Sequence, residues 1–317
     1  MKKFFEETLN LSPNDVGFYK CPLHLCHEHT VFIKDNTFCC LQCGKSGDLE
    51  QLKLLIEEKN MSIDFSDEQK RLFAINRMAM EYFQNSLSIS DTAKKYLEDR
   101  GLDTDIIKLF HIGYANPDWT ATKQYLLKKG FSEDEILKAG LIFRSYKSNK
   151  TYDFYRSRIM FPIIDAWGNV VGFSGRTIVN DKSKYVNTSQ TPVFHKRRSF
   201  FNLNNFDNKL PYIVICEGQM DVIAFARARV SNAVATLGTA LTRSHAYMIA
   251  EMAEEVYFCF DGDTAGQSAL KKAESLFAEI GNIKTKKMKM PHSCKDADEV
   301  LKMFGREGIL KLFETAS

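Results

Sequence analysis

Apolar and polar positions alternate with two different periods along the last third of the chain. Short apolar runs rich in Val, Ile and Phe occupy residues 212–216 and 256–260, and a third β-like stretch covers residues 285–290. Between them, apolar residues recur at helical spacing in residues 221–229, 242–253 and 265–280. Short runs of this kind predict buried strands. Strands that alternate with helices predict a mainly parallel sheet.

The first two thirds of the chain have other patterns. Residues 30–34 and 37–39 predict a hairpin, and an amphipathic helix over residues 49–59 follows before the pattern breaks. Apolar spacing predicts helices over residues 67–87 and 92–102. Residues 156–176 contain two β-like runs around a glycine turn, which predict a second hairpin.

Composition and charge exclude few functions. The chain has 317 residues and a formal net charge of +3, so any basic surface for nucleic acid must be local. No apolar run approaches the roughly 20 residues that span a bilayer. The N-terminus lacks the apolar segment of a signal peptide. We therefore expect a cytoplasmic protein without a membrane partner.

Acidic residues follow each of the three predicted strands. They are Glu217, Asp221, Asp261, Asp263, Asp296 and Asp298. Because ligands of parallel sheets gather at the carboxyl ends of the strands, these side chains should meet in one small volume. Like charges that close require a cation, and oxygen ligands in this number suit Mg²⁺ or Mn²⁺. Any one acid has an alternative role as a helix cap or turn residue. Three acidic groups at successive strand ends favour metal-assisted phosphoryl transfer.

Cysteines cluster near the N-terminus, where they predict a zinc site. Three cysteines and one histidine have paired spacing: Cys21, His24, Cys40 and Cys43. Two ligand pairs with two intervening residues suit tetrahedral zinc. Rival ligands in the same stretch are Cys26, His27, His29 and Cys39. Thiols without a metal, and a zinc ion that only folds the module, are the alternatives.

Basic and polar residues are dense between residues 156 and 196. The candidates for nucleotide and template binding are Arg156, Arg158, Arg176, Lys184, Tyr185, Asn187 and Lys196. Arginine and lysine hold phosphates, while asparagine and tyrosine add hydrogen bonds to sugar and phosphate. A single arginine of this kind is often only a solvated surface charge. The density of these residues beside a predicted metal site favours a role in binding nucleic acid.

Several of these segments resemble the bacterial, DnaG-like primases. Glu217-Gly218-x-x-Asp221, Asp261-Gly262-Asp263-x-Ala265-Gly266 and Lys295-Asp296-x-Asp298-Glu299 are similar to the motifs of Toprim domains. The Arg156–Pro162 and Lys184–Lys196 segments, and the Cys-Pro-x-His start of the cysteine cluster, resemble primase motifs. Mild departures are Ser174, Thr188 and Gln190, none of which removes a charged group that the chemistry requires.

The resemblance implies a fold and a division of the chain. It implies an α+β multidomain protein with a zinc-ribbon-like module, a mixed α/β polymerase subdomain and an α/β Toprim domain with a mainly parallel sheet. The expected parts are a zinc-binding domain (1–58), a linker (59–67), the N-terminal polymerase subdomain (68–208), the Toprim domain (209–300) and a helical end (301–317). We expect hinge-like mobility between the zinc module and the remainder.

The resemblance also implies a function. We expect a DNA primase, a DNA-directed RNA polymerase that makes short RNA primers de novo from nucleoside triphosphates on single-stranded DNA. Glu217, Asp261 and Asp263 would be the main catalytic metal ligands, with Mg²⁺ or Mn²⁺, and one Zn²⁺ would help the N-terminal module to engage template. The family's helicase-binding domain is not expected here, so a replicative helicase would be supplied separately. A free-standing primase of a phage, plasmid or other mobile element fits this expectation, and a truncated piece of a longer protein fits it equally well.

Two alternatives stay open at this point. A Toprim nuclease would use the same acids to cleave a strand, so the size of the product distinguishes it from a primase. A non-enzymatic, zinc-containing DNA-binding replication factor would not need the acids. Replacing Glu217 or Asp261 by alanine would then leave its function intact.

Overall fold

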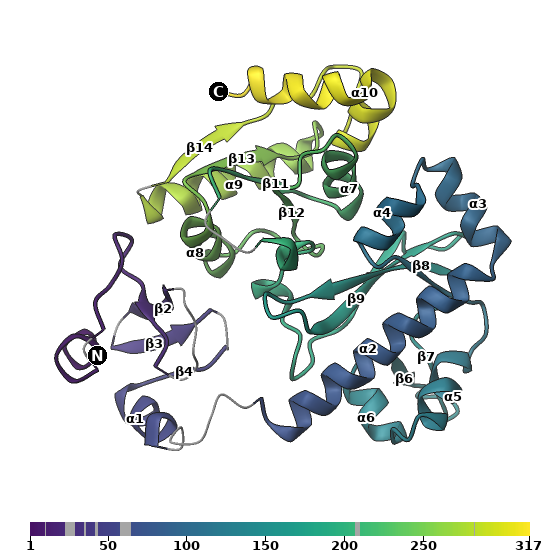
Figure 1. Cartoon of the computed structure of the whole chain (residues 1–317), viewed down its shortest axis with the longest axis horizontal. Helices are drawn as coiled ribbons and strands as arrows, with labels where there is room; N and C mark the ends of the chain where they lie inside the picture. Colours follow the sequence, from purple (N-terminus) through teal and green to yellow (C-terminus); the bar gives the residue numbers. More distant parts are fainter. Residues whose placement is uncertain are drawn as a thin grey trace.

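The structure is a computed structural model that describes residues 1–9, 11–22, 29–34, 36–41, 44–57, 65–206, 210–281 and 283–317. Figure 1 shows three regions: an N-terminal module (up to residue 57), a central subdomain (65–206) and a C-terminal subdomain (210–317). The fold is mixed α/β, as the sequence predicts. Among the helices of these ranges, none combines the length and apolar character that a membrane crossing requires.

The N-terminal module is a small antiparallel sheet with a helix beside it. Its elements are η1 (Phe4–Thr8), β1 (Tyr19–Lys20), β2 (His29–Lys34), β3 (Thr37–Cys40), β4 (Ser46–Gly47) and α1 (Leu49–Glu57). β2 and β3 pair with Phe32 opposite Cys39, which confirms the predicted hairpin. Phe5, Tyr19, Val31, Phe38 and Leu52 form its hydrophobic core.

The central subdomain is built on an antiparallel sheet in the order β10-β9-β8-β5. Its helices are α2 (Asp67–Ser88), α3 (Asp91–Asp99), α4 (Thr104–Leu109), α5 (Ala121–Lys128) and α6 (Glu133–Lys138). Its strands are β5 (Gly113–Ala115), β6 (Ile142–Arg144), β7 (Thr151–Asp153), β8 (Arg158–Ile164), β9 (Val170–Thr177) and β10 (Tyr185–Asn187). The short helices η3 (Lys196–Arg198) and η4 (Leu203–Asn205) follow. The β8–β9 pairing confirms the second predicted hairpin.

Helix α2 packs across this sheet and is fixed at its beginning by polar contacts. Ser66 caps the helix, and apolar side chains such as Ile75 and Phe83 face the sheet. A Cβ on Gly113 would lie 2.6 Å from the backbone of Phe83, so only glycine allows β5 to approach α2 this closely.

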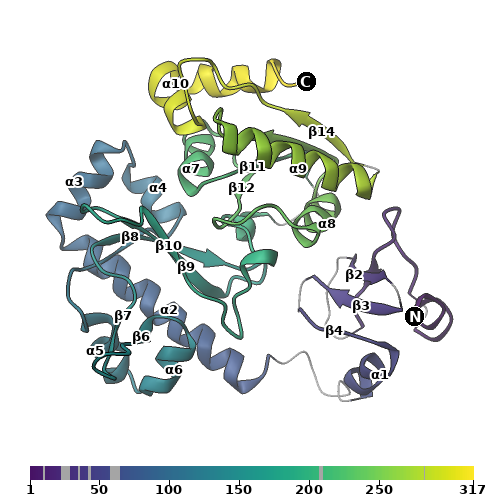
Figure 2. The same ribbon diagram turned by 180° about the vertical axis from the view of Figure 1, so that it is seen from behind.

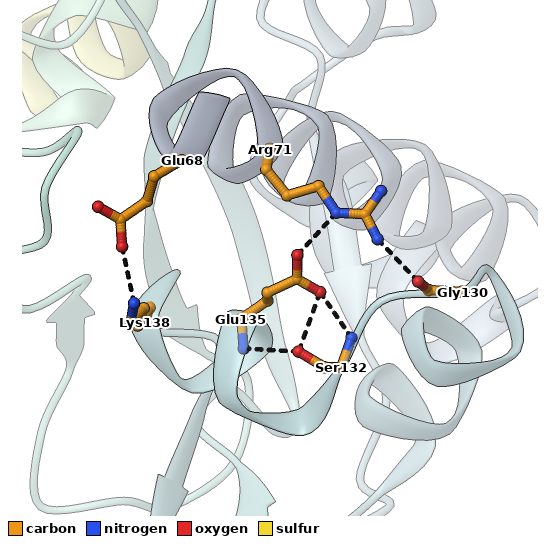
Figure 3. A network of polar contacts seen from close by, with 6 residues as sticks. All are labelled: Glu68, Arg71, Gly130, Ser132, Glu135 and Lys138. Carbon is orange, nitrogen blue, oxygen red and sulfur yellow. Dashed lines mark hydrogen bonds and ion pairs between the residues drawn. The ribbon is translucent and has the colours of Figure 1, made fainter. Parts of the chain in front are cut away.

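Near the start of α2, Arg71 Nε donates to Glu135 Oε1 over 2.7 Å. Arg71 Nη2 also donates to the carbonyl of Gly130 over 2.7 Å, and Lys138 pairs with Glu68 (Figure 3). The Arg71 hydrogen bond is the largest cause that lowers the pKa of Glu135 to about 2.

The C-terminal subdomain has a fully parallel sheet in the order β12-β11-β13-β14, which confirms the predicted sheet type. Its strands are β11 (Ile213–Cys216), β12 (Ala233–Ala235), β13 (Glu255–Cys259) and β14 (Lys284–Lys287). Its helices are α7 (Gln219–Arg227), α8 (Arg243–Met252), α9 (Thr264–Ile280) and α10 (Ala297–Glu314). Alternate strand residues face opposite sides: Val214 belongs to the cluster that includes α7 and α10, and Ile215 to the cluster that includes α8 and α9. The sheet is therefore covered on both faces.

The central and C-terminal subdomains share one hydrophobic core. Ile159 and Phe161 of β8 belong to the same buried cluster as Val214 of β11 and Phe225 of α7. Phe201 also forms a β-bridge with Ala235 of β12. This shared core holds the two subdomains together around the carboxyl edge of the parallel sheet.

The N-terminal module contacts the C-terminal subdomain through α8. The ring centroids of Phe18 and Phe32 each lie 5.0 Å from that of Tyr247. Asn14 Nδ2 donates a hydrogen bond to Glu251. Figure 2 shows the module beside α8 from the opposite direction. The expected hinge itself falls largely on residues 58–64, which lie outside the described ranges, so its mobility stays a prediction.

The observed elements differ from the predicted ones in a few places. Helix α7 begins two residues earlier than predicted, because its N-cap is Gly218, whose N–H the Asp221 carboxylate accepts. Strand β12 was not predicted, since Ala233–Ala235 is a three-residue run without the usual β-branched pattern. The expected helical end lies in α10, which consists of two helical segments that meet at a kink with a non-helical backbone at Gly305.

Candidate active site

The carboxyl edge of the parallel sheet brings together the acids that follow β11 and β13. These strands are parallel neighbours with Cys216 opposite Cys259, so Glu217 and Asp261 emerge at the same edge. The Asp261 backbone N–H donates to Glu217 Oε1 over 2.9 Å. Burial is the largest cause that raises the pKa of each of these two carboxyls. Both groups are therefore held close to each other in a partly dehydrated place.

Asp263 lies at the beginning of α9, where it caps the helix. Its Oδ1 accepts the N–H of Gly266 over 3.0 Å, and this bond is the largest cause that lowers its pKa. A Cβ on Gly266 would lie 2.2 Å from the Asp261 carbonyl oxygen and 2.8 Å from Glu217 Oε1. Glycine at this position therefore lets the helix begin directly against the acidic edge. The capping role and a metal-binding role use different oxygens of Asp263, so one does not exclude the other.

Lys295 lies between two of these acids. Its Nζ is 3.0 Å from Asp263 Oδ2 and 3.4 Å from Asp261 Oδ2. Hydrogen bonds to these two carboxylates raise the pKa of Lys295 to about 12. The segment that carries Lys295 is fixed to the β13 end, because the Gly262 N–H donates to the Lys295 carbonyl over 2.9 Å.

Asp221 is buried in the first turn of α7. Its Oδ2 accepts the Gly218 N–H over 3.2 Å, whereas no donor among the described residues reaches its Oδ1. Burial, together with the charges of Asp296 and Asp261, raises the pKa of Asp221 to about 8, and the Asp298 backbone N–H opposes this rise. A buried carboxyl with few hydrogen-bond donors therefore lies beside the other acids.

The last acidic pair has mixed roles. Asp296 caps α10 by accepting the Glu299 N–H over 2.8 Å. Asp298 is buried, and its Oδ2 accepts from Arg100 over 2.6 Å and from Lys302 over 2.7 Å. The charge of Asp298 is thus already balanced by two cations, one of them from α3–α4 of the central subdomain. Its other oxygen, Oδ1, is buried without a hydrogen-bond partner among the described residues, so the role of Asp298 as a metal ligand stays a prediction.

The donor set fits a hard divalent cation. The pKa values of Glu217, Asp221 and Asp261 are all raised, and a buried oxygen of Asp221 has no donor within the described ranges. A cation that supplied positive charge here would stabilise the ionised forms. Within the described part of the chain, no three acidic, histidine or cysteine side chains already form a metal-binding group.

The zinc hypothesis falls partly outside the described residues. His24 and Cys43 lie there, together with the rivals Cys26 and His27. Cys21 and Cys40 are buried in the core of the N-terminal module, whereas Cys39 points to the less buried face of β3. The four-ligand zinc site therefore stays a prediction.

Several of the predicted binding residues take part in buried networks. Arg158 is buried and donates to the carbonyls of Gly175 and Ser183, over 3.2 and 3.0 Å, and pairs with Asp181. These contacts hold the loop after β9 against β8. Arg158 therefore has a structural partner for most of its donors.

A second network joins the central subdomain to the loop after β12. Arg176 donates to the hydroxyls of Tyr96 and Tyr185, over 2.6 and 2.7 Å. Asn187 Nδ2 donates to the Leu237 carbonyl over 2.9 Å. Among the remaining candidates, Lys184 is exposed and Lys196 is partly exposed. These two lysines are the ones whose positions leave them most accessible to a ligand.

Arg156 lines a cavity of about 620 Å³ at the beginning of β8. Its guanidinium carbon lies 3.9 Å from the centroid of the Trp119 ring and 5.8 Å from that of Phe143. Val179, Asp181 and Ser183 are among the other lining residues. Trp119 is 55% exposed and Arg156 is partly exposed, so the guanidinium covers one face of the indole while the rest of the ring is open to solvent.

Sequence reasoning missed Trp119, Arg100 and Lys295 as site residues. Trp119 and Arg100 acquire their partners only in the folded chain, Arg100 through an acid 198 positions away. Lys295 could have been found, because it directly precedes an acidic pair that the sequence analysis singled out.

Comparison with known proteins agrees with this geometry. Residues 82–207 match the family model of the DNA primase catalytic core, N-terminal domain, and residues 214–301 match a Toprim-like model. DNA primases of Clostridium acetobutylicum and Lactococcus lactis are 33% and 34% identical, and each alignment covers 93% of this chain. The chain spans about half the length of these curated relatives, 53% and 50%.

Solved structures are similar over most of the described fold. The DnaG primase catalytic domain bound to single-stranded DNA is 30% identical, with a TM-score of 0.71 and 80% of each chain covered. The E. coli primase catalytic core is 31% identical, with a TM-score of 0.70, and the match covers 77% of this chain and 80% of that one. The Aquifex aeolicus zinc-binding and RNA polymerase domains match with a TM-score of 0.71 at 27% identity, over 100% of this chain and 83% of that one. The chain therefore belongs to the DnaG-type DNA primase family, with the primase catalytic core followed by the Toprim domain.

Proposed function

We propose that this protein is a DNA primase that joins nucleoside triphosphates into short RNA primers on a single-stranded DNA template. The observation that carries the proposal is the acidic edge of the parallel sheet, where Glu217, Asp261 and Asp263 lie together around one lysine. Family membership supports the same reaction. Mg²⁺ or Mn²⁺ held by these carboxylates would supply the Lewis-acid chemistry of phosphoryl transfer.

The chain's own residues would bind and orient the substrates. Lys184 and Lys196 are accessible cations that would hold triphosphate or template phosphates. Arg176 and Tyr185 would fix β9 to β10, and Asn187 would hold β10 against the C-terminal subdomain through the Leu237 carbonyl. The two lysines would therefore contact the substrates directly, whereas Arg176, Tyr185 and Asn187 would have a structural role.

The cavity beside Trp119 is the proposed place for template. An exposed indole can stack on any base, and the adjacent Arg156 can pair with a phosphate, which suits single strands without a sequence preference. The similar DnaG catalytic domain was solved with single-stranded DNA, which supports a template-binding role for this class of domain. Affinity there should fall as salt rises, because phosphate contacts release counterions.

Further parts of the proposal concern partners. A zinc ion held by Cys21, His24, Cys40 and Cys43 would fold the N-terminal module and help it to contact template. The protein would act in the cytoplasm at a replication fork, with a replicative helicase as a separate partner. A Toprim nuclease is the rival function, since it would use the same acids on a cleavable strand.

A priming assay separates these functions. Single-stranded templates are incubated with the full chain, all four nucleoside triphosphates and Mg²⁺ or Mn²⁺, with the label on the γ-phosphate. Short products that keep the γ-label are expected, since only the first nucleotide of a new chain retains it. A shortened template without such products would instead assign the protein as a nuclease. An intact template without products under either metal would contradict autonomous priming.

A further inference from the structure

Lys295 occupies a position within the acidic cluster that no other described cation shares. It contacts both Asp261 and Asp263, at 3.4 and 3.0 Å. Arg100 and Lys302 pair instead with Asp298, whose side chain is 6% exposed. Asp261 and Asp263 are more accessible, at 21% and 44%. The ammonium of Lys295 therefore neutralises the two carboxylates that an incoming cation would reach most easily.

The backbone of Lys295 is held by two hydrogen bonds, whereas its side chain is largely exposed. The N–H donates to Glu299 Oε2 over 2.7 Å, and the carbonyl accepts from Gly262 over 2.9 Å. The side chain is 54% exposed and has a flexible four-carbon stem. Its ammonium can therefore leave the carboxylates for water without any change in the sheet or in α10.

We propose that Lys295 is a built-in counterion of the acidic cluster, which a divalent metal ion displaces when it binds. This inference rests on the proposed function, because it takes Asp261 and Asp263 as metal ligands. In the metal-free protein the ammonium balances the two carboxylates. A metal ion that binds must displace the ammonium from the two carboxylates. Lys295 therefore lowers the apparent affinity for the metal ion, and removal of its positive charge should raise that affinity.

The test measures metal binding and not primer synthesis. Free Mn²⁺ gives an electron paramagnetic resonance signal that bound Mn²⁺ largely loses, so titration of the full chain yields a dissociation constant. Lys295→Met should bind Mn²⁺ about three- to tenfold more tightly than the wild type, the range expected for partly exposed ion pairs. Its melting temperature without metal should fall, and the rise on adding Mn²⁺ should be larger.

Two variants control for other effects. Lys295→Arg keeps the positive charge and should keep the wild-type dissociation constant to within a small factor. Lys286→Met removes a lysine of β14 that pairs with Glu255 at the beginning of β13, away from the cluster, and should leave Mn²⁺ binding unchanged. Asp261→Asn should remove the Mn²⁺ that binds at the cluster, which identifies the titrated site.

The outcomes separate this inference from the proposed function. If the wild type binds Mn²⁺ through Asp261 but Lys295→Met binds it equally or more weakly, Lys295 is only a structural residue and the inference is wrong. If neither protein binds Mn²⁺ in an Asp261-dependent way, the metal site itself is refuted, and the proposed primase chemistry is refuted together with it.

Discussion

Tyr247 of α8 is the residue on which the contact between the N-terminal module and the C-terminal subdomain most depends. Its ring lies 5.0 Å from the rings of both Phe18 and Phe32. Phe18 is only 1% exposed, and its described ring contacts are with Phe32 and Tyr247. Replacing Tyr247 by alanine should therefore expose Phe18 and weaken docking of the module.

The size of this effect follows from the two aromatic pairs. Each such pair contributes about 0.5–1.5 kcal/mol beyond its buried area. Loss of both should cost about 1–3 kcal/mol, which lowers the ratio of docked to undocked molecules by about 5- to 150-fold. The partly buried hydrogen bond from Asn14 to the Glu251 carboxylate would remain, and a bond of this kind stabilises by about 1.5–3 kcal/mol, so some docking should persist.

Small-angle X-ray scattering of the full chain measures the outcome. Tyr247→Ala should have a larger radius of gyration and maximum dimension than the wild type, because the module separates from α8. Tyr247→Phe keeps the ring and should scatter like the wild type. Tyr146→Ala removes a fully exposed tyrosine and serves as the matched control. A Tyr247→Ala curve that superimposes on the wild-type curve would refute the role of this contact.

Three further substitutions test other contacts. Arg71→Met removes the main cause of the low pKa of Glu135. The pKa of Glu135 in the folded protein is about 2, below the ordinary 4.5. Ionised Glu135 therefore stabilises the folded protein above pH 4.5, and this stabilisation is lost as the pH falls toward 2. The variant should thus melt at a lower temperature at pH 7 and approach the wild type near pH 2, and equal melting at both pH values would contradict this. Trp119→Ala should weaken single-stranded DNA binding, measured by fluorescence anisotropy, by about 5- to 150-fold, which is the contribution of one stacked base. The control Trp167→Ala should leave binding unchanged. Equal losses of affinity in the two variants would contradict a specific role for Trp119 in template binding. Gly113→Ala should lower the melting temperature in circular dichroism, since its Cβ meets the backbone of α2 at 2.6 Å, and an unchanged value would show that β5 can shift.

The parts of the fold that could be predicted are those with a local pattern. The apolar runs of β11 and β13 and the helical spacing of α2 are visible within about ten residues, and each was found close to its observed bounds. Short elements without such a pattern were missed, as β12 shows. The acids at strand ends were predictable because a parallel sheet brings the ends of its strands to one edge.

The parts of the site that could not be predicted depend on contacts between distant residues. Arg100 reaches Asp298 from another subdomain, and the sequence around either residue does not indicate this ion pair. Arg176 likewise donates to Tyr96 and Tyr185, although its sequence context indicated a residue that binds nucleotide or template. The residue types were informative, but their partners are set by tertiary packing, which a local pattern does not contain.

Formation of the first phosphodiester bond is the most direct test of the claim that the acidic edge makes primers. The wild type, Glu217→Gln and Asp261→Asn are compared on one single-stranded template, with γ-labelled nucleoside triphosphate and Mg²⁺ or Mn²⁺. Circular dichroism checks that each variant is folded. We predict a labelled dinucleotide with the wild type and a loss of at least about a hundredfold in its rate with either variant, as expected when a group at the centre of charge stabilisation is removed. Wild-type rates in a folded Asp261→Asn variant would contradict the assignment of the active site.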